Sequence, residues 1–369
     1  MKGPTLDNGN ASNTPLYTQV EQYLRQQIAS GDLGPGDKLP SVQELCRQFG
    51  GINHLTVRRA IKTLVDENIV RSIQGRGSFI TEHSSTGKQV AIVLPHLEDT
   101  IFIRIARGAQ QVLDAHGVRS FILDSRGSET AEADQIQNLR RFPVDGALIY
   151  PIAHSNIAEQ IFQLRLANLS FVLVDRYFED IASSSVVADN RQGGTLMGRH
   201  LAEKGHQRIA WIGESRSISA RLRFSGFLEA LNDAGLACPR SQIKNLVVSS
   251  SSPATYLAAF RVAAEKAVDE LLTLKPPIDA IACCNDPTAI FALKRLRALG
   301  RRVPEDIAVM GFDDVPEAEA AEPSLTTIRQ PMEKLGQEAA CLLLDHLSDK
   351  KLEPKKIILP VELVIRQSA

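Results

Sequence analysis

The sequence has few cysteines, few aromatic residues and no long apolar run, and each shortage excludes a class of protein. Only five of the 369 residues are cysteines, none in a Cys-x-x-Cys spacing, so neither a disulfide framework nor a zinc site is expected. No apolar stretch approaches the ~20 residues of a membrane-spanning helix, and the polar start lacks a signal-peptide core. We therefore expect a cytoplasmic protein with no metal, no other cofactor and no membrane partner.

The chain also lacks a strong net charge. A net charge of −1 excludes a protein that is coated by nucleic acid along its whole length. Hydrophobic residues make up 43% of the chain, enough to give each of two or three compact units a core. Basic residues are concentrated locally instead, which is typical of a chain in which one domain alone meets phosphates. They are Arg58, Arg59, Lys62, Arg71 and Arg76, with only Asp66 and Glu67 opposing them.

The segment 41–65 is patterned as two short helices separated by a pair of glycines. Ser41 is a preferred N-cap residue, and Glu44 stands three residues later, where it completes a capping box. Asn53, after the glycines, is placed to cap the second helix. That helix has an apolar stripe at helical spacing, so its polar side chains face outward, as in a recognition helix that enters the major groove. The stripe is Val57, Ile61, Leu64 and Val65, and the outward residues are Thr56, Arg58, Arg59 and Lys62.

A hairpin with a basic tip follows the second helix. Two short β-branched runs, 69–73 and 78–80, flank Gln74-Gly75-Arg76-Gly77. The glycines permit the positive φ angles of a tight turn and leave Arg76 at its tip, where it suits a narrow, electronegative minor groove. The helices and the hairpin predict a winged helix-turn-helix over residues 15–82. The alternative is a solvated basic helix followed by an ordinary hairpin.

Several short motifs of this segment occur in a fixed order: Pro15-Leu16-Tyr17, Pro35-Gly36, Lys38-Leu39-Pro40-Ser41, Thr56-Val57-Arg58-Arg59-Ala60 and Gly75-Arg76-Gly77. The set resembles the DNA-binding domain of the GntR family of bacterial transcription regulators. The resemblance implies DNA contacts, to which the outward-facing Arg59 is added: Gln43, Asn53, His54, Thr56, Arg58, Arg59 and Arg76. Gln43 and His54 stand where the family often has arginine, and one of the two glycines looks inserted. These departures concern the operator sequence more than DNA binding.

The composition changes twice outside this domain. Residues 1–14 are rich in Asn, Gly, Ser and Thr, which predicts a disordered tail, and residues 83–88 are predicted to form a flexible linker. In residues 89–369, short apolar runs alternate with longer amphipathic stretches. This alternation predicts parallel sheets covered by helices on both faces, and hence the α/β class. The runs are 90–94, 120–123, 146–150, 171–174, 209–212, 280–283 and 307–310.

Polar residues directly after the apolar runs are candidate ligand contacts, because parallel sheets bind ligands at the carboxyl ends of their strands. Each also has a structural interpretation: Asp286 can cap the next helix, and Asp175 can pair with Arg176. A carboxylate accepts hydrogen bonds from two hydroxyls and an arginine donates two, which suits a sugar. The candidates are His96, Tyr150, Asp175-Arg176, Glu214, Asn285-Asp286 and Asp313-Asp314.

Aromatic side chains add a second criterion for a sugar site. Phe102 and Tyr150 are placed to stack on the apolar side of a pyranose ring, whereas Trp211 lies within an apolar run and is expected in the core.

Motifs of the larger domain resemble the effector-binding domain of the lac-repressor family, over about residues 89–367. They include Gly205-His206, Arg223-Phe224-Ser225-Gly226-Phe227, Asn285-Asp286, Gly311-Phe312-Asp313-Asp314 and Pro323-Ser324-Leu325-Thr326-Thr327-Ile328. The resemblance implies a periplasmic-binding-protein fold of two lobes with a cleft between them. It implies effector contacts at Arg223 and Asp286, together with Asp175, Phe102, Tyr150, Arg176 and Asp313. A GntR-like domain in place of the lac-type headpiece is similar to the arabinose-responsive repressors of some Gram-positive bacteria.

These observations predict a ligand-gated transcription regulator, a repressor, that binds an inverted repeat of double-stranded DNA as a homodimer. The expected effector is a sugar, with a nucleobase or another small metabolite as the alternative; the sequence leaves the sign of regulation open. A transport binding protein would have no use for the DNA-binding domain. An enzyme is not expected, because the histidines lack metal-ligand spacing and neither a Gly-x-Ser-x-Gly elbow nor a phosphate loop occurs.

Overall fold

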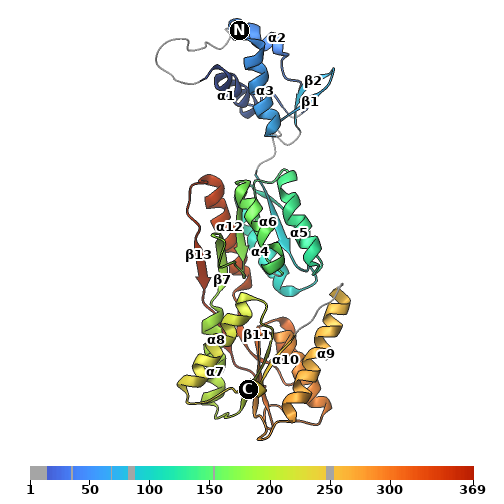
Figure 1. Ribbon diagram of the computed structural model, residues 1–369, viewed down its shortest axis with the longest axis vertical. Helices are drawn as coiled ribbons and strands as arrows, with labels where there is room; N and C mark the ends of the chain where they lie inside the picture. Colours follow the sequence, from blue (N-terminus) through green and yellow to red (C-terminus); the bar gives the residue numbers. More distant parts are fainter. Residues whose placement is uncertain (1–14, 35, 68, 82–87, 153, 247–252) are drawn as a thin grey trace. The chain divides into compact units, whose positions relative to one another are not determined.

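The structure, a computed structural model, describes residues 15–34, 36–67, 69–81, 88–152, 154–246 and 253–369. It divides the chain into two units, residues 1–88 and residues 89–369 (Figure 1). The predicted tail at 1–14 and the predicted linker up to residue 87 lie outside the described residues. Within them, no helix is both long enough and apolar enough to cross a membrane.

The N-terminal unit is a three-helix domain with a β-hairpin. Alternate hairpin residues and one face of each helix enclose a small apolar core, in which Val20, Leu24, Leu45, Val57 and Leu64 are buried. A backbone bridge between Lys38 and Phe79 attaches a third extended segment to the hairpin. The elements are α1 (Leu16–Ala29), α2 (Val42–Gln48), α3 (His54–Asp66), β1 (Val70–Ile73) and β2 (Gly77–Ile80).

The second unit, called the effector unit below, consists of two α/β lobes. The first lobe has an all-parallel sheet in the order β13-β7-β6-β5-β3-β4. Its strands are β3 (Gln89–Leu94), β4 (Arg119–Asp124), β5 (Gly146–Ile149), β6 (Ser170–Val174), β7 (Ser184–Ala188) and β13 (Lys356–Leu359). Its helices are α4 (Thr100–Ala115), α5 (Glu129–Asn138), η2 (Leu139–Arg141), α6 (His154–Leu166) and α12 (Met332–Ser348).

The second lobe repeats this plan with a sheet in the order β14-β12-β11-β10-β8-β9, in which β14 alone runs antiparallel to its neighbour. Its strands are β8 (Ile209–Gly213), β9 (Ile243–Asn245), β10 (Ala280–Cys283), β11 (Ala308–Asp313), β12 (Thr326–Arg329) and β14 (Glu362–Val364). Its helices are α7 (Asn190–Glu203), α8 (Ile218–Asp233), η3 (Arg240–Gln242), α9 (Pro253–Leu272), α10 (Asp286–Ala298) and α11 (Pro316–Glu319).

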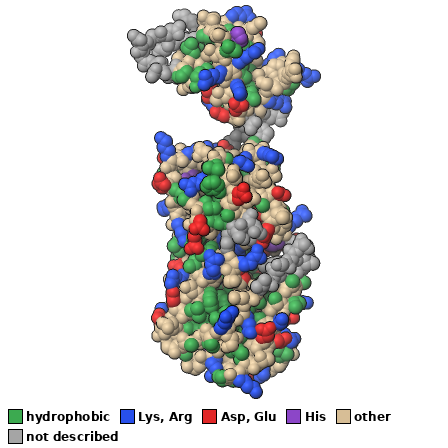
Figure 2. Space-filling view, in the orientation of Figure 1, with side chains coloured by type: hydrophobic (Ala, Val, Ile, Leu, Met, Phe, Trp, Pro, Cys, Tyr) green, Lys and Arg blue, Asp and Glu red, His purple; other side chains and the backbone are tan. Residues whose placement is uncertain are grey.

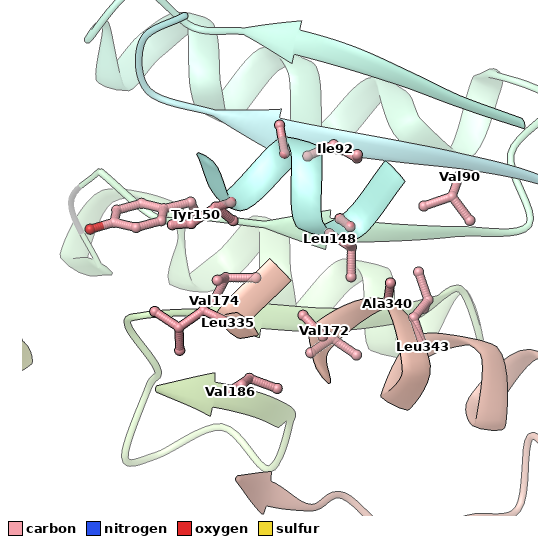
Figure 3. Close-up of a cluster of buried hydrophobic side chains, with 14 of the residues drawn as sticks. Val90, Ile92, Leu148, Tyr150, Val172, Val174, Val186, Leu335, Ala340 and Leu343 are labelled. Carbon is pink, nitrogen blue, oxygen red and sulfur yellow. The ribbon is translucent and has the colours of Figure 1, made fainter. Parts of the chain in front are cut away.

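Each sheet is covered on both faces, as its continuous apolar strands predict. In β3, Val90 and Ile92 point to one face and pack with α4 and α12, while Ala91 and Val93 point to the other and pack with α5 and α6. Figure 3 shows the first of these cores, with α12 lying against the strands. In the second lobe α9 and α10 cover one face and α7 and α8 the other, where Trp211 is buried. The core position predicted for Trp211 is confirmed.

The described chain passes between the lobes three times. It crosses from β7 to α7 at Asp189, from β12 to α12 at Gln330 and from β13 to β14 at Pro360. Two of these crossings are tied together, because the Asp189 backbone N–H donates to the Leu359 carbonyl at 2.8 Å. Several parallel crossings make a hinge, and the predicted two-lobed fold is confirmed.

The apolar runs seen in the sequence all became strands, but five further strands were not predicted. The missed strands β7, β9, β12, β13 and β14 are short, and several mix polar with apolar residues. Four of them flank the lobe crossings. β13 and β14 pair only with strands far away in the sequence, and β9 has only three residues, so the local pattern of these strands is weak.

Candidate functional site

The helix-turn-helix is held by the caps that the sequence predicts. The Ser41 hydroxyl accepts the Glu44 N–H at 3.2 Å, and the Glu44 carboxylate accepts the Ser41 N–H at 2.6 Å. Gly50 and Gly51 take φ angles of 70° and 84°, which allow the tight turn between α2 and α3. The Asn53 side chain then accepts the Leu55 N–H at 2.9 Å and caps α3.

The exposed face of α3 is polar and basic. Val57, Ala60, Ile61 and Leu64 are buried against the unit's core, which leaves the opposite face to solvent. On this face and on the hairpin, the cations form no ion pair with any described residue, as expected for side chains that meet phosphates. They are Arg58, Lys62, Arg71 and Arg76, and the predicted contacts Gln43 and His54 are exposed with them. Figure 2 shows basic side chains over much of this unit.

Arg76 lies at the hairpin tip, as predicted. The flanking Gly75 and Gly77 have φ angles of 75° and 111°. Other residues rarely adopt these positive φ angles, so both positions of the turn favour glycine. The guanidinium of Arg76 is exposed.

Two predicted contacts are placed differently from the others. The Arg59 guanidinium lies over the Tyr17 ring of α1, with its carbon 4.2 Å from the ring centroid, and Thr56 is half-buried. Arg59 therefore packs back onto its own unit, and its role as a DNA contact stays a prediction. Conversely, Leu55 has a 62% exposed side chain in the first turn of α3, and the sequence reasoning passed over it.

The strand ends of the first lobe supply one half of a group of buried polar residues between the two lobes, called the cleft below. The Tyr150 hydroxyl, beyond β5, donates to Asp175 Oδ2 at 2.6 Å. Figure 3 shows its oxygen pointing away from the apolar cluster. Phe102 packs edge-on against the Tyr150 ring at 4.8 Å between centroids. Burial raises the pKa of Tyr150 well above its usual value, so the hydroxyl remains a donor at neutral pH.

The strand ends of the second lobe form the other half. Arg223 on α8 donates through Nη1 to the Cys284 carbonyl at 2.7 Å and to Asp313 Oδ1 at 3.3 Å. Its Nε donates to Asn190 Oδ1 at 2.7 Å. Gln330, in the crossing from β12 to α12, donates to the same Asp313 oxygen at 2.6 Å. Asp313 thus joins the binding residues of this lobe to the hinge.

Close helix packing places Arg223. A β-carbon on Gly194 in α7 would lie 1.8 Å from the Arg223 carbonyl oxygen, and one on Gly226 would lie 1.9 Å from the Arg191 carbonyl oxygen. Glycine at both positions lets α7 and α8 touch backbone to backbone. That contact brings Asn190 of α7 within hydrogen-bonding distance of the Arg223 guanidinium.

The two halves meet directly. The Ser219 hydroxyl of the second lobe donates to the Asp175 carbonyl at 2.9 Å, and Asp175 has a positive φ of 64°. Asp313 also has a positive φ, of 124°. Strained backbone at two facing strand ends is typical of binding sites. Further out, Arg216 pairs with Glu129 across the lobes at 2.7 Å.

Three buried polar atoms near the cleft have no hydrogen-bond partner among the described residues: Asp175 Oδ1, Arg176 Nε and Gln330 Oε1. An unpaired buried polar atom costs about 1–3 kcal/mol, so a ligand that pairs with these atoms would gain affinity. Two of the three are acceptors and one is a donor. A molecule that fills the cleft must therefore both donate and accept.

Buried carboxylates give the cleft an unusual protonation state. Burial raises the pKa of Asp313 to about 8; the nearby Arg223 opposes this shift, and the Asp286 carboxylate adds to it. Burial also raises the pKa of Asp286 to about 6.

Asp286 is placed differently from the other predicted effector contacts. It is completely buried, and its two oxygens accept hydrogen bonds from the Thr327 hydroxyl at 2.5 Å and the Val315 N–H at 2.9 Å. The carboxylate thus ties β12 to the residues after β11, and its role as an effector contact stays a prediction. Asp286 does not cap α10. The N-cap is its neighbour Asn285, whose Oδ1 accepts the Thr288 N–H at 3.0 Å.

Arg176 is placed in part as a structural residue. Its Nη1 donates to the Pro151 and Ile152 carbonyls at 2.8 and 2.5 Å, and its Nε is 3.9 Å from Asp175 Oδ2. The guanidinium thus fixes the loop after β5, while its buried Nε has no hydrogen-bond partner among the described residues. The structure therefore gathers Phe102, Tyr150, Asp175, Arg176, Arg223 and Asp313 at the strand ends, and sets Asp286 behind them.

Sequence reasoning missed Gln330 and Ser219. Gln330 directly follows a strand and so satisfies the strand-end criterion, but β12 itself was not predicted. Ser219 lies inside α8 and carries no local signal. In the described part of the chain, no three His, Cys, Asp or Glu side chains are grouped as a metal site would require.

Comparisons with known proteins agree with both units. The description "Bacterial regulatory proteins, gntR family" matches residues 16–80, and "Periplasmic binding protein-like domain" matches residues 199–369. The arabinose metabolism transcriptional repressor of Geobacillus stearothermophilus is 30% identical over 365 residues, which cover 96% of this chain and 97% of that protein. The chain belongs to the GntR family of bacterial transcription regulators. This GntR regulator carries a periplasmic-binding-protein-like domain after its helix-turn-helix.

Solved structures extend the comparison. A complex of the transcriptional regulator CelR with cellobiose has a TM-score of 0.68 and 26% identity, and the match covers 97% of this chain and 100% of that one. A LacI-family regulator from Enterococcus faecium with bound ribose has a TM-score of 0.63 and 26% identity, covering 76% and 98%. The GntR regulator described here is thus a DNA-binding transcription regulator, and both predicted resemblances are confirmed.

Proposed function

We propose that this regulator is a repressor whose operator binding is controlled by a sugar bound in the cleft of the effector unit. The observation that carries the proposal is the set of unpaired buried atoms at the strand ends. Hydroxyl groups of a sugar can donate to Asp175 Oδ1 and Gln330 Oε1 and also accept from Arg176 Nε. A phosphate or carboxylate only accepts, so it would leave both of those oxygens unpaired.

Each cleft residue has a role in this proposal. Asp175 of the first lobe and Asp313 of the second lobe bind hydroxyl groups of the sugar. Arg223, also of the second lobe, donates to a hydroxyl or to the ring oxygen. Asn285 adds an amide, because its Oδ1 caps α10 while its nitrogen has no partner among described residues. Phe102 and Tyr150 supply the apolar wall. The repressor name of the Geobacillus relative and the sugars bound to the two solved structures support this class of ligand.

The DNA-binding roles follow from exposure. His54, Arg58 and Lys62 enter the major groove with α3, Gln43 approaches from α2, and Arg76 inserts into the adjacent minor groove. We expect a homodimer, so that two such units read an inverted repeat.

Control of DNA binding requires that the effector favour one lobe arrangement. A sugar that bridges Asp175 in one lobe and Arg223 in the other stabilises the closed cleft, and the crossings at Asp189, Gln330 and Pro360 act as the hinge. A tenfold change in DNA affinity requires a coupling free energy of only about 1.4 kcal/mol. Residues 83–88 are proposed to transmit the change to the DNA-binding unit.

A gel-shift titration tests the proposal most directly. The full chain is mixed with the DNA upstream of its own gene, and the complex is titrated with pentoses, hexoses, disaccharides and purines. Release of the DNA by one sugar is the expected result. Release by a purine alone would replace the sugar by a nucleobase, and strengthened binding would reverse the sign of regulation. Sedimentation velocity of the same chain tests the dimer, and a monomer at gel-shift concentrations would contradict it.

A further inference from the structure

The first lobe of the effector unit contains a second polar cavity, of about 350 Å³, at the edge of the sheet opposite the cleft. Ser170 begins β6 and Ser184 begins β7, and both line this cavity. Because the strands are parallel, their amino ends lie at this edge, whereas Tyr150 and Asp175 follow the carboxyl ends. The cavity, called the amino-edge pocket below, is therefore separate from the proposed sugar site.

Three of the fourteen residues that line the amino-edge pocket are cations. Arg165 comes from the end of α6, and Lys350 and Lys351 come from the turn between α12 and β13; Glu353 is the one acidic residue of the lining. Neither lysine forms an ion pair with any described residue. Arg165 donates through Nη1 to the Ala182 carbonyl at 3.0 Å, which fixes its guanidinium at the pocket wall.

The floor of the pocket is a built hydrogen-bond network rather than loose surface side chains. Ser184 is 4% exposed, and its hydroxyl lies 2.6 Å from His346 Nε2 and accepts the Lys355 N–H at 3.0 Å. His346 is half-buried and lines the pocket with it. A fixed polar floor under unpaired cations is an arrangement that binds anions.

We propose that the amino-edge pocket binds the phosphate group of a small phosphorylated molecule. Three cations match a phosphate dianion better than a carboxylate with one charge. The volume suits a small ligand, since such pockets measure about 300–1,000 Å³. Leu169, Phe171 and Leu352 supply an apolar wall for the body of that molecule. The inference goes beyond the proposed function, because it gives the regulator a second ligand of a different chemical class.

The experiment uses the full chain without DNA and inorganic phosphate as the probe. Phosphate replaces chloride at constant ionic strength while the imidazole resonances of the histidines are followed by NMR. Saturable movement of the His346 resonance is expected. In the double variant K350A/K351A the half-saturating concentration should rise at least tenfold. The matched control is K266A/K294A, which removes two exposed lysines of the other lobe and should leave it unchanged.

Four results would overturn the inference. Non-saturable movement of the resonance, or equal binding by K350A/K351A, means that the cations of the pocket hold no phosphate. Loss of phosphate binding in R223A places the phosphate in the cleft instead. If K350A/K351A retains phosphate binding but flattens the salt dependence of operator binding, these lysines serve DNA phosphates. The sugar titration can fail without affecting any of these measurements, so the two proposals are tested separately.

Discussion

The two units of this regulator use charged side chains in opposite ways. In the N-terminal unit, Arg58, Lys62 and Arg76 come from one short segment, stand in solvent and have no ion-pair partner among described residues. In the effector unit, Asp175, Arg223 and Asp313 come from distant segments, are buried and are held by hydrogen bonds to other side chains or to the backbone. A long polyanion is met by exposed, mobile cations, whereas a small ligand needs fixed partners in a site without water.

Arg223→Ala should give the largest effect and tests the buried half of the comparison. Removing the guanidinium leaves Asp313, Asn190 and the Cys284 carbonyl without their common donor. We expect the response to effector to fall roughly 10- to 100-fold, since a hydrogen bond that involves a charged group contributes about 1.5–3 kcal/mol. Operator affinity without effector should stay within about twofold.

Gel shifts with and without the identified sugar measure both quantities. Arg199→Ala is the control, because this arginine lies on the neighbouring helix α7 of the same lobe and is exposed. An unchanged response in Arg223→Ala, with a normal melting curve, would remove Arg223 from the site.

Arg58→Ala tests the exposed charges of the N-terminal unit. Arg59→Ala, at the adjacent residue, is the comparison variant. Arg58 is free for DNA, so its loss should weaken operator binding by about 1–3 kcal/mol. Arg59 lies over Tyr17, so its loss should instead cost about 0.5–1 kcal/mol of unfolding free energy and affect DNA less. Operator titrations and urea unfolding of both variants separate the two. A larger DNA effect for Arg59→Ala would restore it as a principal contact.

The raised pKa of Asp313 predicts that the free energy of unfolding of the effector unit depends on pH. Burial raises the pKa of Asp313 to about 8, whereas an unfolded aspartate titrates near ~3.9. Between these pH values the folded state binds the extra proton, so the free energy of unfolding falls as pH rises, by at most about 1.4 kcal/mol per pH unit. Asp286 contributes only up to about pH 6. Unfolding in urea from pH 6 to 8 should show this decline, and Asp313→Asn should flatten it; an equal decline in the variant would contradict the assignment.

Glu129→Gln should give the smallest effect. Its carboxylate pairs with Arg216 across the lobes, but Arg216 is 55% exposed, and exposed pairs contribute about 0.2–1 kcal/mol. We expect effector affinity to fall by about two- to fivefold, with operator affinity unchanged. Glu322→Gln is the control, since it breaks a pair with Arg297 inside one lobe. Equal effects of the two variants would show that the interlobe pair has no special part in closure.

Local chemistry explains which parts of the structure the sequence predicted. The Ser41 capping box, the Asn53 cap and the glycine-flanked Arg76 depend on neighbours a few residues away, and all three form as expected. The run 280–283 became β10 (Ala280–Cys283) because a strand buried on both faces is apolar throughout. Such features carry their whole signal within about ten residues.

Local sequence patterns did not predict which of two adjacent polar residues faces a binding site and which one packs within the protein. Arg58 and Arg59 are chemically alike, yet they differ because α1 brings Tyr17 under one of them. Asn285 and Asp286 differ because the end of β12 brings Thr327 onto the second. Gln330 follows β12, a strand that the sequence pattern did not predict, so only the structure identifies it as a strand-end residue at the hinge.

The sequence by itself therefore determined the two-unit organisation, the recognition helix with its hairpin and the polar strand ends of an α/β domain. The tertiary structure decided which of those polar residues share a cleft, which serve the fold and where a second pocket opens. The physical reason is how far apart along the chain the contacting residues lie. Helix caps, tight turns and buried strands depend on contacts close in sequence, whereas the partners of Arg223 in this structure lie 33 to 90 residues away along the chain.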